Sequence, residues 1–266
     1  MKFLSDFVES LFFHCDGRAY WKPELYGLRG DEFKVRTSAG NELDGMVLQP
    51  KQKKSEPIQT VLYFHAAQFN REFNLPQVVF LATSGFRVIL FDYSGCGLST
   101  GKTTIDGLLS DAEAVLNWWQ TTTGEGKPLV FFGQGVGCDA ALQLYATHPE
   151  SCSGLILESA YGSRRGWVKD RWGPVIGDAA AKCLQYTASE PVSVAAKIKV
   201  PMVLIYPQRD DFARSNQRKL MSEASLRAKV WTVPGTKYLG IFANAQGDWH
   251  KAVVDFVLKI GKHAAK

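Results

Sequence analysis

The sequence has few cysteines, no long apolar run and no cluster of like charges. Its five cysteines are spread over 266 residues without a C-x-x-C pair, and no stretch of about 18 apolar residues is present. Lys and Arg total 31 but are scattered among 26 acidic residues, which leaves a net charge of +5 and no basic stripe. We therefore expect reduced thiols, a cytoplasmic location, no membrane span and no nucleic-acid partner. Nothing in the composition points to a cofactor or a metal, and we expect neither.

The first residues, MKFLSDFVESLFFHCDGR, contain a short amphipathic pattern. Apolar residues recur at positions 3, 4, 7, 8, 11 and 12, which is helical spacing. Asp6 and Glu9 interrupt the pattern, so it predicts neither a secretory signal nor a membrane span. We expect residues 1–24 to form this helix and a lead-in that pack on the rest of the chain. Peripheral membrane or partner contact is the alternative, although the polar face is not enriched in Lys or Arg.

Residues 25–266 alternate apolar, strand-like segments with helical ones. Continuous apolar strands separated by helices are typical of a mostly parallel sheet that is covered on both faces. We therefore predict one α/β domain with a sheet of about eight strands. The first two strands flank Ala-Gly-Asn and should form an antiparallel hairpin. Strands are expected at 32–38, 42–49, 58–64, 86–92, 127–133, 154–159, 200–206 and 229–233, and helices near 74–84, 106–122, 138–147, 212–224 and 247–261.

Residues 161–199 interrupt this alternation. The segment is too long for a loop and too short for a domain, and insertions after the strands of such a sheet lie over the ligand crevice. We therefore expect a small cap insertion. Its first part is basic and aromatic and includes Trp167. Two interpretations stay open: a solvated charged helix with packing tryptophans, or a lid over an anionic or lipid-like ligand.

The segment FFGQGVGCDAAL (131–142) predicts a strand, a tight glycine turn and a helix. This is the setting of the G-x-S-x-G nucleophile elbow, but Gly135 stands at the serine position. Together with four further motifs it resembles the α/β-hydrolase superfamily, in particular serine aminopeptidase-like enzymes and compact bacterial esterases. The resemblance covers about residues 25–260 and implies the α/β-hydrolase fold. The other motifs, in the family's order, are YFHAAQFN (63–70), FDYSGCGLSTG (91–101), YPQRDD (206–211) and VPGTKYLGIF (233–242).

The resemblance assigns a role to each position of a catalytic triad. The acid, which follows a late strand, is Asp210, with Asp211 as its competitor. The histidine position after Pro-Gly holds Tyr238, and the nucleophile position holds Gly135. Two of the three members are therefore replaced. Glycine relieves the backbone strain that a nucleophile carries at this turn, as expected of a chain no longer selected for attack.

The resemblance also points to the remaining groups of the site. The oxyanion hole would use the backbone N–H groups of Ala67 and Val136, and these survive a change of side chain. His65, at a strand end beside the turn, is expected to be a structural histidine rather than a base. We expect the crevice under the cap to remain a pocket, bounded by Ala67, Gly135, Val136, Tyr238 and Trp167.

Two functions remain open. The first is a non-catalytic protein that binds a small acyl-like or anionic ligand, or a protein partner, in the former crevice. The alternative is an esterase, thioesterase or peptidase with an engineered nucleophile knockout or an unorthodox catalytic constellation. Cys96 and Cys138 are expected near the crevice, but Cys138 should be a buried, inert thiol, and no histidine motif lies beside either. The joint loss of the serine, the histidine and the usual oxyanion glycine, which is Ala66 here, favours the first function.

Overall fold

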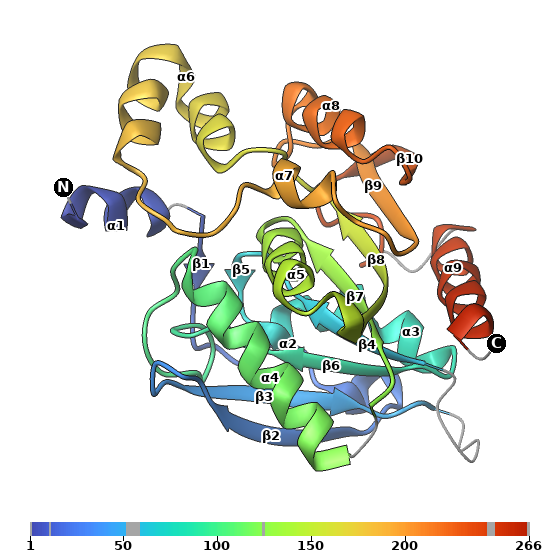
Figure 1. Ribbon diagram of the computed structural model, residues 1–266. Helices are drawn as coiled ribbons and strands as arrows, with labels where there is room; N and C mark the ends of the chain where they lie inside the picture. The colour runs from blue at the N-terminus through green and yellow to red at the C-terminus, as the bar shows by residue number, and fades with distance from the viewer. Residues whose placement is uncertain (1, 11, 52–58, 124–125, 244–247, 265–266) are drawn as a thin grey trace.

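A single sheet of eight strands organises the chain (Figure 1). The computed structural model describes all residues except 1, 11, 52–58, 124–125, 244–247 and 265–266. The strand order is β10-β9-β8-β7-β4-β6-β3-β2, and every pair is parallel except β2–β3 and β3–β6. The prediction of a mostly parallel α/β-hydrolase sheet is confirmed. The strands are β2 (Gly30–Arg36), β3 (Glu42–Leu48), β4 (Thr60–Phe64), β6 (Arg87–Phe91), β7 (Leu129–Gln134), β8 (Cys152–Glu158), β9 (Met202–Arg209) and β10 (Lys229–Lys237).

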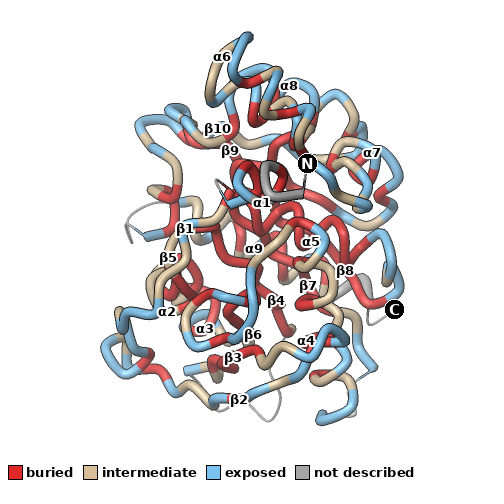
Figure 2. Tube along the Cα trace, turned by 90° about the vertical axis from the view of Figure 1, so that its left-hand side faces the viewer, coloured by how far each residue is buried: buried red, intermediate tan, exposed pale blue. Residues whose placement is uncertain are grey.

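Both faces of the sheet are buried, as its apolar strands require. In β4, Leu62 and Phe64 join the hydrophobic cluster on one face, while Val61 and Tyr63 join the cluster on the other. The first face is covered by α4 (Gly107–Thr123) and α5 (Val136–Thr147), and the second by α3 (Val79–Thr83) and α9 (Asp248–Ala264). Figure 2 shows the buried residues concentrated in the central strands and in α5, between more exposed outer helices.

The helix expected near 74–84 is broken into three pieces, so that prediction is wrong. Helix α2 (Arg71–Asn74) begins at Asn70, whose side chain accepts a hydrogen bond from the Phe73 N–H at 3.0 Å. A 3-10 turn, η2 (Leu75–Gln77), then separates α2 from α3. Pro76 explains the break, because its ring excludes a continuous α-helix across this position. Two other expected elements, the strand 58–64 and the helix 247–261, each begin with a residue outside the described part of the chain.

The N-terminal segment forms a helix and a short strand. Helix α1 (Lys2–Ser10) lies beside α6 (Arg164–Cys183), with Val8 buried and Phe7 56% exposed. Strand β1 (His14–Cys15) pairs in parallel with β5 (Gln68–Phe69) to form a second sheet, which the sequence pattern did not predict. The segment therefore packs on the rest of the chain. Membrane contact through α1 stays a prediction, and none of the described helices is long and apolar enough to cross a bilayer.

Cys15 and Cys96 form a disulfide, so the expectation that all thiols are reduced is wrong. The two cysteines are separated by 81 residues and meet because β1 pairs with β5 beside the turn that follows β6. Such a tertiary contact leaves no spacing pattern in the sequence. The other three cysteines, at positions 138, 152 and 183, are free. Reduced thiols were a ground for the cytoplasmic location, which therefore stays a prediction without that support.

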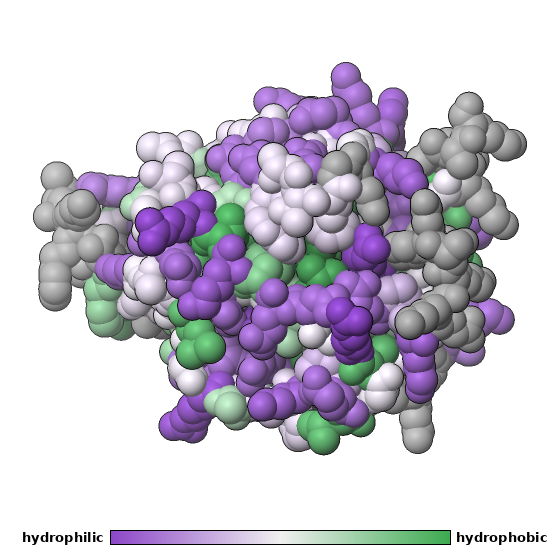
Figure 3. Space-filling view, turned by 90° about the horizontal axis from the view of Figure 1, so that it is seen from below, coloured by the Kyte–Doolittle hydropathy of each residue, from purple (hydrophilic) through white to green (hydrophobic). Residues whose placement is uncertain are grey.

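On the β2 side of the molecule, the residues that the structure describes form no large hydrophobic patch. Seen from below in Figure 3, hydrophobic residues form small, separate groups between hydrophilic ones. Small scattered apolar groups are normal on a protein surface and indicate no partner. Open α/β sheets bind their ligands at the carboxyl ends of the parallel strands, and the functional site is expected there.

Replacing Cys15 by Ser should lower the free energy of unfolding by about 4 kcal/mol, because the disulfide closes a long loop in the unfolded chain. The measurement is the denaturant midpoint without reductant, compared with that of Cys183→Ser, which removes a free cysteine on α6. Titration of five free thiols in the unreduced, denatured wild type would contradict the assignment.

Candidate active site

The turn after β7 has the geometry of a nucleophile elbow. Gly135 lies between β7 and α5 with φ 56° and ψ −117°, and its N–H donates to the Glu158 carbonyl at 2.9 Å. A non-glycine residue would be strained in this conformation. Gly137 has no room for a side chain either, because a Cβ there would overlap the Phe64 carbonyl oxygen. The G-x-G-x-G run therefore brings helix α5 close to the sheet, as in an elbow that carries a nucleophile.

The hydroxyl of Tyr238 occupies the space in which a nucleophile side chain would stand. A Cβ added at Gly135 would overlap the Tyr238 hydroxyl oxygen and lie 3.1 Å from its Cζ. The tyrosine ring is held by Phe212, with ring centroids 4.8 Å apart and planes within 9°. Burial raises the pKa of Tyr238 well above 10, so its hydroxyl is neutral at pH 7. The positions predicted for the nucleophile and for the histidine are thus in contact, and glycine and a neutral tyrosine offer neither a nucleophile nor a base.

Asp210 lies just beyond β9, at the acid position. Its Oδ1 accepts hydrogen bonds from the N–H groups of Phe212 at 3.1 Å and Ala213 at 2.9 Å. Burial raises its pKa above the ordinary aspartate value. Asp210 therefore shapes its own loop instead of orienting a histidine. Asp211, the competitor for this role, is exposed and lines the pocket described below.

A buried polar chain runs beneath the elbow. Glu158, at the end of β8, is fully buried and accepts a hydrogen bond from the Gln134 side chain. Gln134 in turn accepts one from the Tyr63 hydroxyl and donates to Gln77 Oε1 at 3.2 Å. Burial raises the pKa of Glu158 to about 8, which keeps the carboxyl protonated at pH 7. The sequence pattern did not indicate this carboxyl, because it ends an otherwise apolar strand.

Some of these buried groups lack a partner within the part of the chain that the structure describes. They are the Tyr238 hydroxyl, Glu158 Oε1 and Asp210 Oδ2. Glu158 and Asp210, when ionised, would both raise the pKa of Tyr238, so the three groups lie in one region. Unpaired buried polar atoms are costly, and these three lie together beside the elbow.

The residues of the expected oxyanion loop lie beside the elbow. Val136 begins α5 and is buried, and the Ala67 carbonyl accepts the His14 N–H at 2.7 Å. His65 is 1% exposed, and its Nδ1 lies 2.7 Å from the Ala66 carbonyl oxygen. Burial lowers the pKa of His65 to about 4, so it is neutral at pH 7. The oxyanion role of Ala67 and Val136 and the structural role of His65 stay predictions.

A cavity of about 470 Å³ lies over Tyr238. Three of the residues expected to bound a pocket, Ala67, Trp167 and Tyr238, line it, whereas Gly135 and Val136 are buried and take no part in the lining. Its walls are mainly aromatic. The other lining residues come from the N-terminal segment, the second sheet, α6 and the loop between β9 and α8 (Ser215–Ala224): Phe12, His14, Gln68, Phe69, Arg171, Trp172, Asp211 and Phe212.

The cations at the start of the 161–199 segment have different surroundings. Arg164 is fully buried and makes two hydrogen bonds to Asp139 of α5, at 2.7 and 2.6 Å, so it fixes α6 to the elbow helix. Arg165 donates to carbonyl groups of the segment itself, and Lys169 pairs within α6. Arg171 has no ion pair among the described residues and lines the cavity. Of these four cations, it is the one placed to meet a ligand.

Comparisons with known proteins agree with this geometry. A family model described as alpha/beta hydrolase fold matches residues 59–229. The chain belongs to the α/β-hydrolase family. This chain is 25% identical over 254 residues to YfhR of Escherichia coli, and the match covers 94% of this chain and 87% of that protein. It is 27% identical over 203 residues to Protein bem46 of Schizosaccharomyces pombe, covering 75% and 67%.

Solved hydrolase structures resemble it in fold. The esterase Pf2001 of Pyrococcus furiosus superposes with a TM-score of 0.74 at 17% identity, covering 92% of this chain and 98% of that one. An esterase of Thermogutta terrifontis gives 0.66 at 17% identity, covering 87% and 99%. At these identities the likeness concerns the fold alone. Among the described residues, no group of three or more His, Cys, Asp or Glu is arranged to hold a metal ion.

Replacing Gly135 by Ala should destabilise the protein less when Tyr238 is also replaced by Phe. The Phe variant removes the oxygen that the new Cβ would meet, although the strain of positive φ remains. A double-mutant cycle of unfolding free energies should therefore give a coupling of about 0.5–3 kcal/mol in favour of the double variant. Additive effects of the two changes would show that the hydroxyl does not fill this space.

Replacing Glu158 by Gln should flatten the dependence of stability on pH. From the ordinary glutamate pKa of about 4.3 up to about 8, folded wild type keeps a proton that the unfolded chain loses. Its stability therefore falls as pH rises through this window, by at most about 1.4 kcal/mol per pH unit. The thermal midpoint of Glu158→Gln, taken relative to that of wild type, should rise from pH 5 to pH 8. The exposed control Glu24→Gln should show no such trend. A constant difference would mean that Glu158 is ionised throughout.

Proposed function

We propose that this hydrolase-fold protein is a non-catalytic member of its family that binds a small acyl-like or anionic molecule in the former active-site crevice. The observation that carries the proposal is the position of the Tyr238 hydroxyl in the nucleophile space above Gly135. Acyl transfer needs a nucleophile and a base that activates it, and neither position of the triad supplies one.

The cavity over Tyr238 supports a binding role. Aromatic walls suit an apolar body. The guanidinium of Arg171, which has no ion pair with any residue the structure describes, suits an anionic end. In this proposal the 161–199 segment serves as a cap, fixed to α5 by Arg164 and Asp139 and presenting Trp167 to the ligand. A cytoplasmic location and a protein partner at the same crevice are further parts of the proposal that await their own tests.

The alternative is a hydrolase with an unorthodox nucleophile, as the esterase names of the structural neighbours suggest. Cys138 is the nearest candidate, but its buried thiol donates to the carbonyls of Gly133 and Glu158. Burial raises the pKa of Cys138 well above 9, and a neutral thiol is a poor nucleophile. These contacts favour the binding protein over the enzyme.

The ligand site is tested with 1-anilinonaphthalene-8-sulfonate, an aromatic anion whose fluorescence rises on binding. Arg171→Gln should weaken its binding about 2–10-fold, the effect of losing about 0.5–1.5 kcal/mol of charge-assisted contact. The matched control is Lys182→Gln, which removes an exposed cation of the same helix outside the cavity. If Arg171→Gln and Lys182→Gln bind the probe with equal affinity, the probe does not bind in this cavity.

Catalysis is tested with a fluorophosphonate probe, which labels activated serines. We expect no labelling of the wild-type chain, since Gly135 has no hydroxyl to react. Stoichiometric labelling that maps to a residue of the crevice would contradict the proposal and establish an unorthodox hydrolase.

A further inference from the structure

We propose that the Cys15–Cys96 disulfide is a thiol–disulfide exchange site that a dithiol reductant opens, and that its opening loosens one wall of the ligand cavity. The inference rests on the proposed function, because it concerns the regulation of the same cavity. It makes ligand affinity depend on the redox state of a bond outside the former catalytic centre.

The disulfide adjoins the cavity wall. Strands β1 and β5 are paired, and His14, Gln68 and Phe69 in these strands all line the cavity. Phe12, three residues before Cys15, lines it as well and stacks on Trp167 with ring centroids 4.4 Å apart. The covalent bond therefore holds in register a segment that contributes both ring surface and an imidazole to the ligand site.

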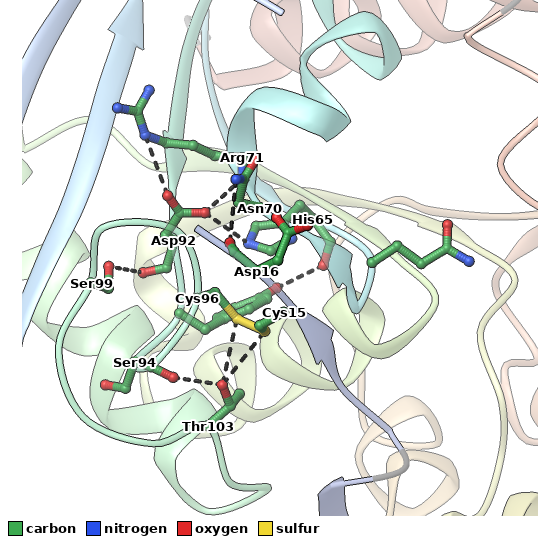
Figure 4. The surroundings of a disulfide bond; sticks show 12 residues. Cys15, Asp16, His65, Asn70, Arg71, Asp92, Ser94, Cys96, Ser99 and Thr103 are labelled. Carbon is green, nitrogen blue, oxygen red and sulfur yellow. Dashed lines mark hydrogen bonds and ion pairs between the residues drawn. A yellow bond between two sulfur atoms is a disulfide. The ribbon is translucent and has the colours of Figure 1, made fainter. Parts of the chain in front are cut away.

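The other half of the disulfide belongs to the rigid part of the fold. Cys96 is fully buried in the turn after β6, where its N–H donates to the Tyr93 carbonyl at 2.8 Å. The Tyr93 hydroxyl in turn donates to the His65 carbonyl at 3.0 Å. Figure 4 shows Cys96 bonded to Cys15 beside Thr103. The bond thus connects the N-terminal segment to the loops at the carboxyl end of the sheet.

The surroundings can accommodate the reduced cysteines. Thr103 Oγ1 lies 3.5 Å from Cys96 Sγ and 3.7 Å from Cys15 Sγ. The threonine gives its own hydrogen to the Ser94 carbonyl at 2.6 Å, so it presents a lone pair to the sulfur atoms. A thiol formed by reduction can donate to this oxygen, and the cleaved state need not leave a buried S–H without an acceptor.

Exchange is expected to begin at Cys15, since its side chain is half-buried whereas Cys96 is enclosed. A reductant thiolate attacks Cys15 Sγ, forms a mixed disulfide with it and displaces Cys96 as a thiolate, which takes a proton. The second thiol of the reductant then attacks its own sulfur in the mixed disulfide and releases Cys15. The reductant ends as a disulfide, and the protein gains two electrons and two protons as two thiols.

Several non-covalent bonds would still hold the segment after reduction. The Gly97 N–H donates to the Asp16 carbonyl at 3.0 Å, and the Asn70 side chain donates to the Arg18 carbonyl at 2.7 Å. Earlier in the segment, Glu9 accepts the Ile105 N–H at 3.1 Å. Reduction should therefore loosen the wall without unfolding the protein, which suits a switch rather than a structural staple alone.

The experiment compares oxidised and dithiothreitol-reduced full-length protein, with Cys15→Ser as a permanently open form and Cys183→Ser as the matched control. The first readout is the affinity for 1-anilinonaphthalene-8-sulfonate. The second needs no ligand: it is the rate of tryptic cleavage after Arg18, which is exposed just beyond the disulfide. Reduction should weaken the probe's affinity at least threefold and speed this cleavage at least tenfold. Cys15→Ser should match reduced wild type under either condition, and Cys183→Ser should respond as wild type does.

Equal probe affinities and equal cleavage rates in the two redox states would overturn the proposal, as would five free thiols in the unreduced protein. Faster cleavage with unchanged probe affinity would overturn its regulatory part, since the bond would then hold the segment but not the site. If the probe bound in neither state, the proposed ligand function itself would fail, and cleavage would decide the state of the disulfide alone. The two failures are therefore distinguishable.

Discussion

The site is organised by a steric constraint, the occupation of the space above Gly135 by the Tyr238 hydroxyl. A residue with a side chain at the elbow would meet this oxygen, and a histidine at position 238 would have no nucleophile to serve. Glycine at position 135 and tyrosine at position 238 are thus sterically compatible with each other. Phe212 stacks on Tyr238, and its N–H is bonded to Asp210, so all three triad positions form one packed unit. In the proposed function, the chain keeps the elbow geometry of a hydrolase without its reacting groups.

The surrounding framework fixes the elements that border the cavity. The buried Arg164–Asp139 pair fixes the 161–199 segment to the elbow helix, and removal of one partner of such a pair is far more costly than an exposed ion pair would suggest. Protonated Glu158 and Gln134 support the elbow from below. These interactions keep the strand ends and α6 at a fixed separation, which leaves the aromatic cavity between them.

The sequence allowed much of this fold to be predicted, because its information lies in local patterns. Apolar runs predicted the strands, and the glycines around Gly135 predicted the elbow. Features that depend on contacts between distant segments left no local pattern. The pairing of β1 with β5 and the resulting Cys15–Cys96 bond belong to this class. So does the burial of Arg164, which reads as a surface cation until its partner Asp139 is in place.

The central claim is that the catalytic centre is closed by a matched pair of substitutions at Gly135 and Tyr238. It is tested most directly by ester turnover of 4-nitrophenyl butyrate by wild type, Gly135→Ser and Gly135→Ser/Tyr238→His. The account predicts no turnover above background for the first two and measurable turnover with an acyl-enzyme burst for the double variant, in which a nucleophile and a base are restored and the overlap is relieved. Turnover by Gly135→Ser alone would contradict it, because the serine would then have found room and a base despite Tyr238.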